Sequence, residues 1–340
     1  MATLRYFVGL DIAAETFTAA IGTTPWKLLV KANQFDNSPD GFQQLCQWLR
    51  QHDCTPEQTV LCMEATGVYG EGLAYYLVAQ TYQLAIEPPL KVKRAFKPSG
   101  PKTDAVDSEQ IAEYAYRYSD ELMLWQPPTA LVEQLHVLLA TREQLVQQST
   151  AQQNALKALR RKAVRIPFAE HVYEQMLAET KLRIKALEQE IRRLIDQHPT
   201  TRRLLTLLLT IPGVGLLLAA HLLVLTQCAT RPFPAAKLAA HLGIAPYEHQ
   251  SGTSVYARPT SRHYGPSEPR KLLHLAARSV STHNPHFRAY YARKVAEGKA
   301  KKLVLNNVAN KLVRIICAIL ETQMEYDANY RANKLVRAQN

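Results

Sequence analysis

Four acidic residues in the first third of the chain carry the clearest chemical signal in the sequence. Asp104 and Asp107 lie three residues apart at the start of a predicted helix, so their carboxylates share one face of that helix. Asp11 and Glu64 each end an apolar run that is typical of a buried strand. Carboxylate oxygens are hard ligands, and such a set favours Mg²⁺ over softer metals. Taken singly, each acid is equally well explained as a helix cap or a turn residue.

A basic stretch directly precedes the carboxylate pair. It contains five basic side chains, four prolines and a glycine between Pro88 and Asp104. Such a cluster attracts a polyanion, and its position would bring that polyanion next to the acids. The candidate nucleic-acid contacts in this stretch are Lys91, Lys93, Arg94, Lys97 and Lys102.

The elements that must position these residues follow a recognisable order. Apolar patterns predict strands at 6–11, 17–22, 27–32, 59–63 and 83–86, with helices at 41–51, 69–80 and from Asp104 onward. The order βββαβαβα is typical of an RNase H-like, or RuvC-like, α/β domain. In that fold, carboxylates at strand ends and on a late helix converge at one edge of the sheet. We assign this domain to residues 1–125.

The next two segments are predicted to be helical. Residues 126–200 are poor in glycine, and their apolar spacing predicts two long helices, 129–164 and 168–197, paired as an antiparallel coiled-coil arm. An intramolecular spacer and an oligomerisation arm both fit this pattern. Residues 201–340 form a mostly helical C-terminal domain. Its pentad Ile211-Pro212-Gly213-Val214-Gly215 is similar to a helix-hairpin-helix turn that can hold a DNA phosphate, although a tightly packed turn needing glycine explains it equally well.

The net charge of +12 is concentrated near the C-terminus. From Ser251 to Asn340 there are 16 Lys and Arg residues against 5 Asp and Glu residues. We find neither an amphipathic lipid-binding helix nor an apolar stretch of membrane length, so nucleic acid is the expected partner and a membrane is not. The scattered cysteines predict neither a disulfide nor a zinc site, as suits the cytoplasm.

Basic and aromatic side chains alternate in this C-terminal region. Aromatic rings can stack on bases while the cations contact phosphates, although about half of these rings are expected in helix cores. The candidate contacts are Arg258, Arg262, Arg270, Lys271, Arg278, Lys301 and Lys302, with Tyr256, Tyr264, Phe287, Tyr290 and Tyr291 as candidate stacking rings. Gln250-Ser251-Gly252, just before them, is an ordinary turn on spacing alone.

Two blocks of motifs resemble one known family. Glu64-Ala65-Thr66-Gly67 and Lys102-Thr103-Asp104-Ala105-Val106-Asp107 form the first block. The second consists of the pentad at 211–215, the segment from Leu238 to Pro246, and Gln250-Ser251-Gly252. Together they resemble the DEDD insertion-sequence transposases of the IS110 family, which are known as bridge-RNA-guided recombinases. The resemblance covers essentially the full chain.

This resemblance implies a complete mechanism. Asp11, Glu64, Asp104 and Asp107 would bind Mg²⁺, and Ser251 would become covalently linked to a DNA 5′-phosphate. A non-coding bridge RNA would select donor and target double-stranded DNA, and strand exchange would pass through a Holliday junction. The protein would be a homo-oligomer, a tetramer built from dimers, in which the acids of one subunit meet the serine of another. It would act in the bacterial or archaeal cytoplasm, associated with the nucleoid.

Three other readings of the sequence remain open. A RuvC-like structure-specific nuclease would use the four acids to activate water, and Ser251 would be inert. An actin-like sugar kinase is suggested by Gly9-Leu10-Asp11-Ile12, but the second half of the chain lacks a second glycine-rich phosphate loop. A non-catalytic RNA-binding scaffold is disfavoured because all four acids are present. Ser254 and Ser261 are nearby competitors for the role of nucleophile.

Overall fold

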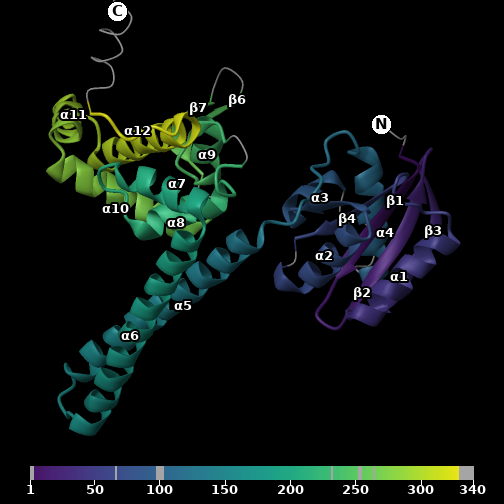
Figure 1. Cartoon of the computed structure of the whole chain (residues 1–340), viewed down its shortest axis with the longest axis horizontal. Helices are drawn as coiled ribbons and strands as arrows, with labels where there is room; N and C mark the ends of the chain where they lie inside the picture. The colour runs from purple at the N-terminus through teal and green to yellow at the C-terminus, as the bar shows by residue number, and fades with distance from the viewer. Residues whose placement is uncertain are drawn as a thin grey trace, which may run out of the picture. The chain divides into compact units, whose positions relative to one another are not determined.

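The chain divides into two compact units, Met1–Pro127 and Pro128–Asn340, each of which is described by itself (Figure 1). The computed structural model describes residues 4–65, 67–96, 103–230, 233–251, 255–262 and 265–328. For residues 248–251 and 255–259 it describes the backbone alone. The predicted helical arm and the predicted C-terminal domain both fall within the second unit.

A five-stranded mixed sheet forms the centre of the first unit. Its spatial order is β3-β2-β1-β4-β5, in which β1, β2 and β3 are antiparallel and β4 and β5 run parallel to β1. This is the sheet that the RNase H-like prediction requires, and it confirms the predicted fold class of this unit. The strands are β1 (Tyr6–Ile12), β2 (Thr16–Thr23), β3 (Lys27–Asp36), β4 (Thr59–Glu64) and β5 (Gln83–Glu87).

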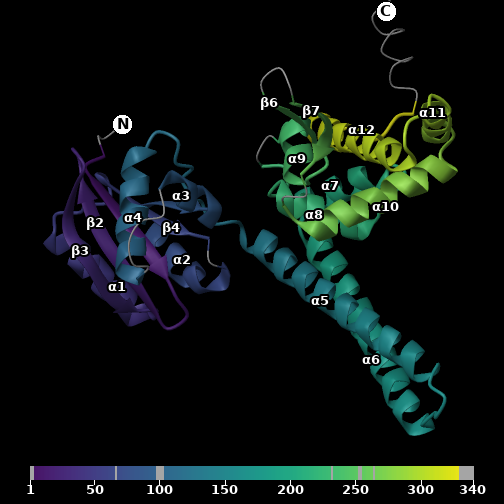
Figure 2. The same ribbon diagram turned by 180° about the vertical axis from the view of Figure 1, so that it is seen from behind.

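Helices cover both faces of this sheet. Alternation along β1 sends Val8 and Leu10 into one core, with residues of α1 and α2, and Phe7 into another, with residues of α4. Figure 2 shows α4 lying across the sheet. The basic stretch, for which no helix was predicted, begins with the short helix α3. The bounds are α1 (Pro39–Gln51), α2 (Glu71–Ala79, after a 3₁₀ turn at Gly67–Gly70), α3 (Pro89–Ala95) and α4 (Asp104–Arg117).

After α4 the chain returns to the free edge of the sheet. Leu124 forms an antiparallel bridge with Ala85 of β5, and the amide of Trp125 donates to the carbonyl of Leu84 at 2.7 Å. The Trp125 ring lies edge-on to Tyr75 of α2, with the ring centroids 5.3 Å apart. The segment therefore covers part of an edge strand that would otherwise be open to pairing.

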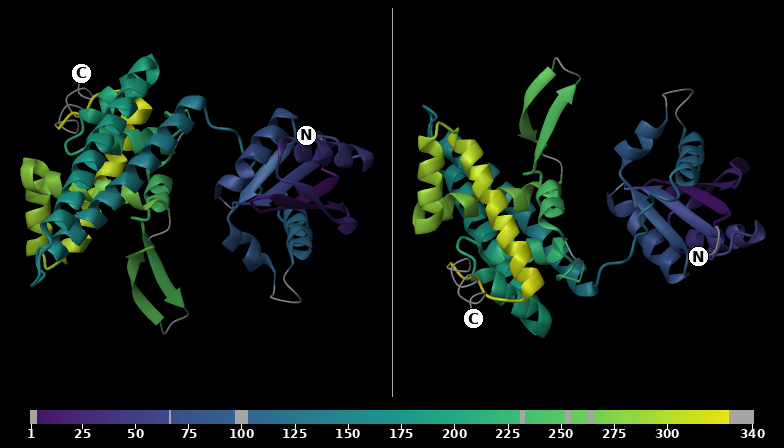
Figure 3. Two further views of the ribbon diagram at one scale, coloured as in Figure 1. Left: turned by 90° about the horizontal axis from the view of Figure 1, so that it is seen from below. Right: turned by 90° about the horizontal axis from the view of Figure 1, so that it is seen from above.

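Two long helices begin the second unit, α5 (Ala130–Leu159) and α6 (Pro167–Gln197). They run side by side in Figures 1 and 3, as the sequence predicted. Contacts between them include the ion pair of Arg142 with Glu188 at 2.7 Å and the Thr180–Gln152 hydrogen bond at 3.3 Å. Regular coiled-coil packing and a role in oligomerisation stay predictions.

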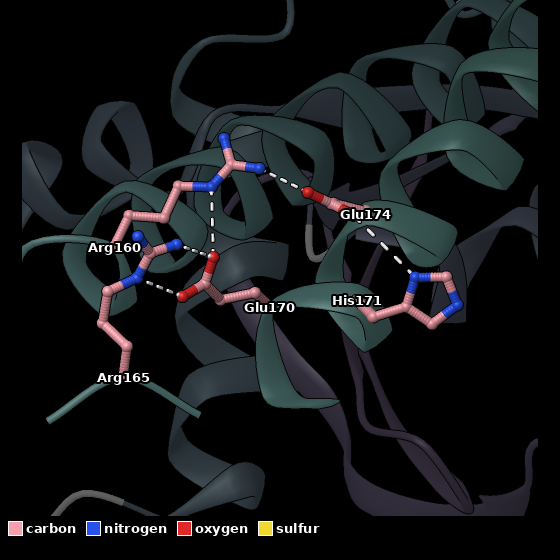
Figure 4. A network of polar contacts seen from close by, with 5 residues as sticks. All are labelled: Arg160, Arg165, Glu170, His171 and Glu174. Carbon is pink, nitrogen blue, oxygen red and sulfur yellow. Dashed lines mark hydrogen bonds and ion pairs between the residues drawn. The ribbon is translucent and has the colours of Figure 1, made fainter. Parts of the chain in front are cut away.

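An ion-pair network holds the tip of this helix pair (Figure 4). Arg165 donates to both carboxylate oxygens of Glu170, at 2.7 and 2.6 Å, and Arg160 pairs with both Glu170 and Glu174. The Arg165 guanidinium lowers the pKa of Glu170, which is only 7% exposed. These ion pairs tie the end of α5 and the turn after it to the start of α6, and the bidentate geometry makes the attachment directional.

The remaining elements build the C-terminal core of the second unit. Its largest helix is α12, whose buried face packs against α7, α9, α10 and α11. One antiparallel hairpin, β6–β7, accompanies the helices. The bounds are α7 (Pro199–Leu209), α8 (Leu216–Leu225), α9 (Ala235–His241), β6 (Pro246–Ser251), β7 (Val255–Ser261), α10 (Ser267–His283), α11 (Pro285–Ala296) and α12 (Lys301–Thr322).

The length and composition of α12 differ from what the sequence analysis expected. Among the described residues it is the one helix long and apolar enough to cross a membrane, with a mean hydropathy of 1.6. Its apolar side chains Val304, Val308, Leu312 and Ile316 are fully buried in the core of the second unit. The apolar face of α12 is therefore explained by its packing against neighbouring helices.

The pentad at 211–215 forms the turn between α7 and α8. Gly213 has a φ of +80°, and a Cβ at this position would lie 2.8 Å from Val280 Cγ1 and 3.0 Å from the Ala276 carbonyl oxygen, both on α10. Glycine is thus required for the conformation and for the close approach of α10. This supports the tightly packed turn, and phosphate binding by a helix-hairpin-helix element stays a prediction.

Candidate active site

The first two acids leave neighbouring strands at the same edge of the sheet. β1 and β4 are parallel, and Leu10 pairs with Met63 in their register. The next residue of each strand is Asp11 on β1 and Glu64 on β4. Parallel strands present their carboxyl ends together, so the register brings these two acids to one place, as the sequence predicted.

The other two acids occupy the first turn of α4. The N-cap is Thr103, whose Oγ1 accepts a hydrogen bond from the Val106 amide at 3.3 Å. Asp104 is therefore the first helical residue, and the alternative in which Asp104 itself is the cap is wrong. Asp104 and Asp107 share one face at the positive end of the helix dipole, which stabilises their negative charge.

Two residues that the sequence analysis did not select fix α4 against the sheet. Thr18 of β2 lies opposite Asp11 in the β1–β2 register, and its Oγ1 donates to the Asp104 carbonyl at 3.1 Å. Gly9 of β1 faces α4 so closely that a Cβ would lie 2.1 Å from the Ser108 carbonyl oxygen and 2.3 Å from the Ala112 amide nitrogen. A lone glycine inside an apolar strand was the available signal for this close approach.

Replacing Gly9 with alanine is expected to destabilise the first unit by about 3 kcal/mol, because the added methyl group must displace the backbone of α4. All three tryptophans of the chain, Trp26, Trp48 and Trp125, lie in the first unit, so their fluorescence during denaturant unfolding reports on it.

Gly72→Ala is the matched control for this measurement. A Cβ at Gly72 would meet Phe42 at an ordinary 3.5 Å, and alanine favours the helix α2. Equal unfolding midpoints for Gly9→Ala and Gly72→Ala would contradict the role assigned to Gly9.

All four acids line a single cavity of about 480 Å³. Asp11, Glu64 and Asp107 are half-buried, and Asp104 is exposed. Thr18 also lines the cavity. The structure thus gathers residues that are separated by as many as 96 positions in the sequence.

The donor set of this cavity fits a hard divalent cation. Four carboxylates supply only oxygen ligands, which suits Mg²⁺ or a similar ion. Among the described residues, no three His, Cys, Asp or Glu side chains lie close enough to hold an ion as they are placed. Four like charges repel one another, so their closer convergence requires a cation.

One lysine of the basic stretch reaches the same cavity. Lys93 of α3 is among the residues that line it. Lys91, two residues earlier, instead pairs with the buried Glu87 at 3.1 Å. Arg94 is exposed, and Lys97 and Lys102 lie outside the described residues. Of the three predicted contacts that the structure describes here, Lys91, Lys93 and Arg94, Lys93 is the one that lines the cavity with the acids.

The predicted contacts of the second unit have several different environments. Arg270 donates to the Leu242 carbonyl at 3.3 Å, and Lys271 pairs with Glu268 at 2.7 Å. The Arg262 guanidinium lies 5.2 Å from the centre of the Tyr247 ring. Arg278, Lys301 and Lys302 are exposed.

Some of the predicted contacts are buried in the core or lie outside the described residues. Phe287 is 7% exposed within the core and does not form a stacking surface. The side chains of Tyr256 and Arg258 and the whole of Tyr264 lie outside the described residues, as do Thr66 and Ser254.

Ser251 is the last residue of β6, where it pairs with Val255 of β7. On spacing alone the sequence predicts an ordinary turn here, because a glycine follows the serine, whereas the structure places Ser251 in a strand. The hairpin projects from the helical body of the second unit (Figure 3). The four acids therefore belong to the first unit and the predicted nucleophile to the second.

Comparisons with known proteins give matches in both units of the chain. A family model described as "Transposase", for the DEDD transposases of IS110, matches residues 8–163, and one described as "Transposase IS116/IS110/IS902 family" matches residues 205–292. An IS110 protein of 43.6 kDa from Streptomyces coelicolor is 32% identical over 148 residues, which are 44% of this chain and 35% of that protein.

Other relatives match over nearly their full length. The pilin gene-inverting protein of Moraxella bovis is 30% identical over 332 residues, 95% of this chain and 98% of that protein, and its Moraxella lacunata counterpart matches equally. Among solved structures, Thermus thermophilus RuvC in complex with a Holliday junction substrate covers 36% of this chain at 10% identity and a TM-score of 0.28. With both family models matched in order and full-length relatives at 30% identity, the chain belongs to the IS110 family of transposases and is a DNA recombinase.

Proposed function

We propose that this recombinase cuts and rejoins donor and target DNA through a covalent phosphoserine at Ser251, with Mg²⁺ at the carboxylates and a bridge RNA that selects both DNA partners. The observation that carries the proposal is the single cavity lined by Asp11, Glu64, Asp104 and Asp107. Gathering four acids from three separate segments in one cavity costs stability, because their negative charges repel one another. Such an arrangement is expected where the acids have a function.

The four carboxylates would hold the metal, and the surrounding residues would place the DNA. A divalent ion bound there supplies charge neutralisation at the phosphoryl oxygens and at the leaving oxygen. Lys93, at the same cavity, contacts a non-bridging phosphate oxygen with its ammonium group. Thr18 and Gly9 keep α4, and with it Asp104 and Asp107, in place against β1.

Ser251 would act as the nucleophile in a balanced exchange. The Ser251 hydroxyl gives up its proton as its Oγ attacks the phosphorus. The bond between phosphorus and the 3′ oxygen breaks, and that oxygen leaves as a hydroxyl by taking up a proton, so no net proton is gained or lost. The serine is then linked to the 5′-phosphate of the cut strand. The 3′ hydroxyl of another strand reverses the step, so no external energy source is needed, and successive strand exchanges pass through a Holliday junction.

The proposed function also includes assembly of several copies of the protein and selection of DNA by the bridge RNA. Large apolar side chains are exposed at the tip of the helix pair, with Val164 at 79%, Phe168 at 76% and Ile166 at 61%. This supports self-association through the tip. We propose that the protein is a homo-oligomer, a tetramer built from dimers, in which the acids of one subunit meet Ser251 of another. The basic surplus after Ser251 supports binding of RNA and DNA backbones in the cytoplasm, at the nucleoid.

A RuvC-like nuclease is the second candidate function. It is favoured by one observation, that the four acids share a cavity within the first unit alone. Those acids could then activate water without any residue of the second unit. The two functions differ in covalency, because a nuclease leaves no bond between protein and DNA.

The test uses the full-length protein with its co-purified RNA, Mg²⁺, and donor and target DNA. The reaction is stopped in denaturant, separated on a gel, and the DNA-linked peptide is identified by mass spectrometry. We expect a peptide that contains Ser251, formed with Mg²⁺ and RNA and missing when EDTA or ribonuclease is added first. Metal-dependent cleavage without any adduct would overturn the recombinase mechanism and leave the nuclease.

Lys93→Ala is expected to slow strand cleavage by about 10- to 100-fold, the loss of one hydrogen bond to a charged group. The measurement is the single-turnover rate at saturating DNA. Lys31→Ala, which removes an exposed lysine of β3, controls for the change in net charge. Equal rates for the two variants would contradict the contact assigned to Lys93.

A further inference from the structure

Both ends of the hairpin that carries Ser251 contact the C-terminal end of α9. On the entering side, the amides of Ile244 and Ala245 both donate to the Ala239 carbonyl, at 3.0 and 3.2 Å. On the leaving side, Gly265 has a φ of +84°, and a Cβ there would lie 1.9 Å from the His241 carbonyl oxygen. Both ends of the hairpin are therefore packed against the same helix terminus.

Two asparagines of α12 bind the backbone just before β6 begins. Asn306 Nδ2 and Asn310 Nδ2 donate to the carbonyl of Ile244, at 3.0 and 3.1 Å. Asn310 Nδ2 also donates to the Asn306 carbonyl at 3.0 Å, which fixes its own amide. The two residues are four apart and share one face of the helix. A carbonyl oxygen has two lone pairs, so both acceptor positions of Ile244 are filled by these side chains.

A third donor reaches the preceding turn. Arg270 of α10 donates from Nη1 to the carbonyl of Leu242, at 3.3 Å. Leu242 and Ile244 are fully buried, as are Val308 and Leu312 on the core side of α12. The base of the hairpin is thus tied to two helices whose own positions are set by the core.

We propose that Asn306 and Asn310, supported by Arg270, are positioning residues that set the direction in which the β6–β7 hairpin presents Ser251. A two-stranded hairpin is marginally stable by itself, so its orientation depends on its attachment. Two hydrogen bonds to one carbonyl restrict the backbone at the point where β6 leaves the body. The proposal rests on the proposed role of Ser251 as nucleophile.

The double variant Asn306→Ala/Asn310→Ala tests this in the full-length protein. It removes both side-chain donors and leaves the core side of α12 unchanged. Hydrogen exchange is measured over residues 246–251 and 255–261, together with the single-turnover rate of adduct formation at saturating DNA and RNA. We expect exchange in the hairpin to become about 10-fold faster, and adduct formation to slow by about 10- to 100-fold.

Controls separate positioning from a general loss of structure. Asn307→Ala removes an asparagine of the same helix that, among the described residues, has no bond to Ile244, and we expect wild-type rates and exchange. Exchange in α12 itself and the affinity for DNA are expected to stay within about 2-fold of wild type in the double variant. The single variant Asn310→Ala, which keeps one donor, is expected to be intermediate and covers the case in which the double variant does not fold.

Several outcomes would overturn the proposal. Unchanged exchange in the hairpin would show that the asparagines do not hold it. Faster exchange with an unchanged adduct rate would show that the direction of the hairpin does not govern reaction. The double variant could instead lose DNA affinity, or exchange faster in α12, to the same extent as its adduct rate falls. That result would show that the two asparagines maintain the structure of the unit and do not position the hairpin. Absence of any adduct in the wild type would instead refute Ser251 as nucleophile, and the exchange data would still decide whether Asn306 and Asn310 hold the hairpin.

Discussion

Asp11→Asn is expected to reduce metal-dependent strand cleavage by about 10³-fold, because a metal ligand contributes several kcal/mol at a phosphoryl-transfer transition state. Asparagine keeps the shape and one oxygen of the side chain and removes its charge. The backbone pairing of Asp11 with Thr18 is retained. The first unit should therefore stay folded, and the loss should be confined to metal binding and chemistry.

Two measurements check this result. Single-turnover cleavage gives the rate, and titration of the protein with Mg²⁺, followed calorimetrically without DNA, shows whether the ion still binds. Asp36→Asn is the matched control, because Asp36 is an exposed acid at the end of β3 and does not line the cavity. Cleavage by Asp11→Asn at the rate of Asp36→Asn would show that the cavity is not the active site.

Ser251→Ala is expected to abolish the protein–DNA adduct while leaving Mg²⁺ binding unchanged. Alanine removes the only atom that can form the phosphoester and lets β6 keep its pairing with Val255. The adduct is quantified on denaturing gels with end-labelled DNA. Strand exchange between donor and target DNA should be lost in parallel, since both joining steps require the covalent intermediate.

Ser261→Ala serves as the comparison, because Ser261 ends the other strand of the same hairpin. We expect wild-type adduct levels for this variant. An adduct that survives in Ser251→Ala and disappears in Ser261→Ala would move the nucleophile to the far end of β7. Cleavage that survives in Ser251→Ala without an adduct would assign the acids to hydrolysis by water.

The sequence alone was sufficient to predict the sheet and the gathering of the four acids at one edge of it. Strands of alternating or continuous apolar residues are strong signals. Acids at the carboxyl ends of two neighbouring parallel strands must lie at the same edge of the sheet. The approach of α4 could not be predicted in the same way. It depends on contacts between residues far apart in the chain, Gly9 with Ser108 and Thr18 with Asp104, and no local pattern encodes them.

The basic stretch shows why net charge does not identify contacts. Lys91 and Lys93 are two residues apart and chemically identical, but the helix α3 turns them in different directions. Lys91 pairs with Glu87, whereas Lys93 lines the acidic cavity. Pro89 begins this helix at its N1 position, where proline is favoured, although no helix was predicted for the stretch.

The hairpin of Ser251 was missed for a different reason. Each strand is short, and a serine next to a glycine is more often found in a turn than in a strand. The anchoring of this hairpin depends on Asn306 and Asn310, which follow Ile244 by more than 60 positions. Similarly, the length of α12 does not distinguish a core helix from a membrane span until its neighbours are known.

Trp125 is the last residue of the first unit with a hydrogen bond to the sheet in the described structure, and α5 begins at Ala130. Residues 126–129 connect the two elements. In mechanical terms, a pull transmitted along the chain is first resisted by the two contacts with β5, the Leu124–Ala85 bridge and the Trp125–Leu84 hydrogen bond. Once these two contacts break, the load passes along the chain to the C-terminal end of α4, the helix whose first turn carries Asp104 and Asp107.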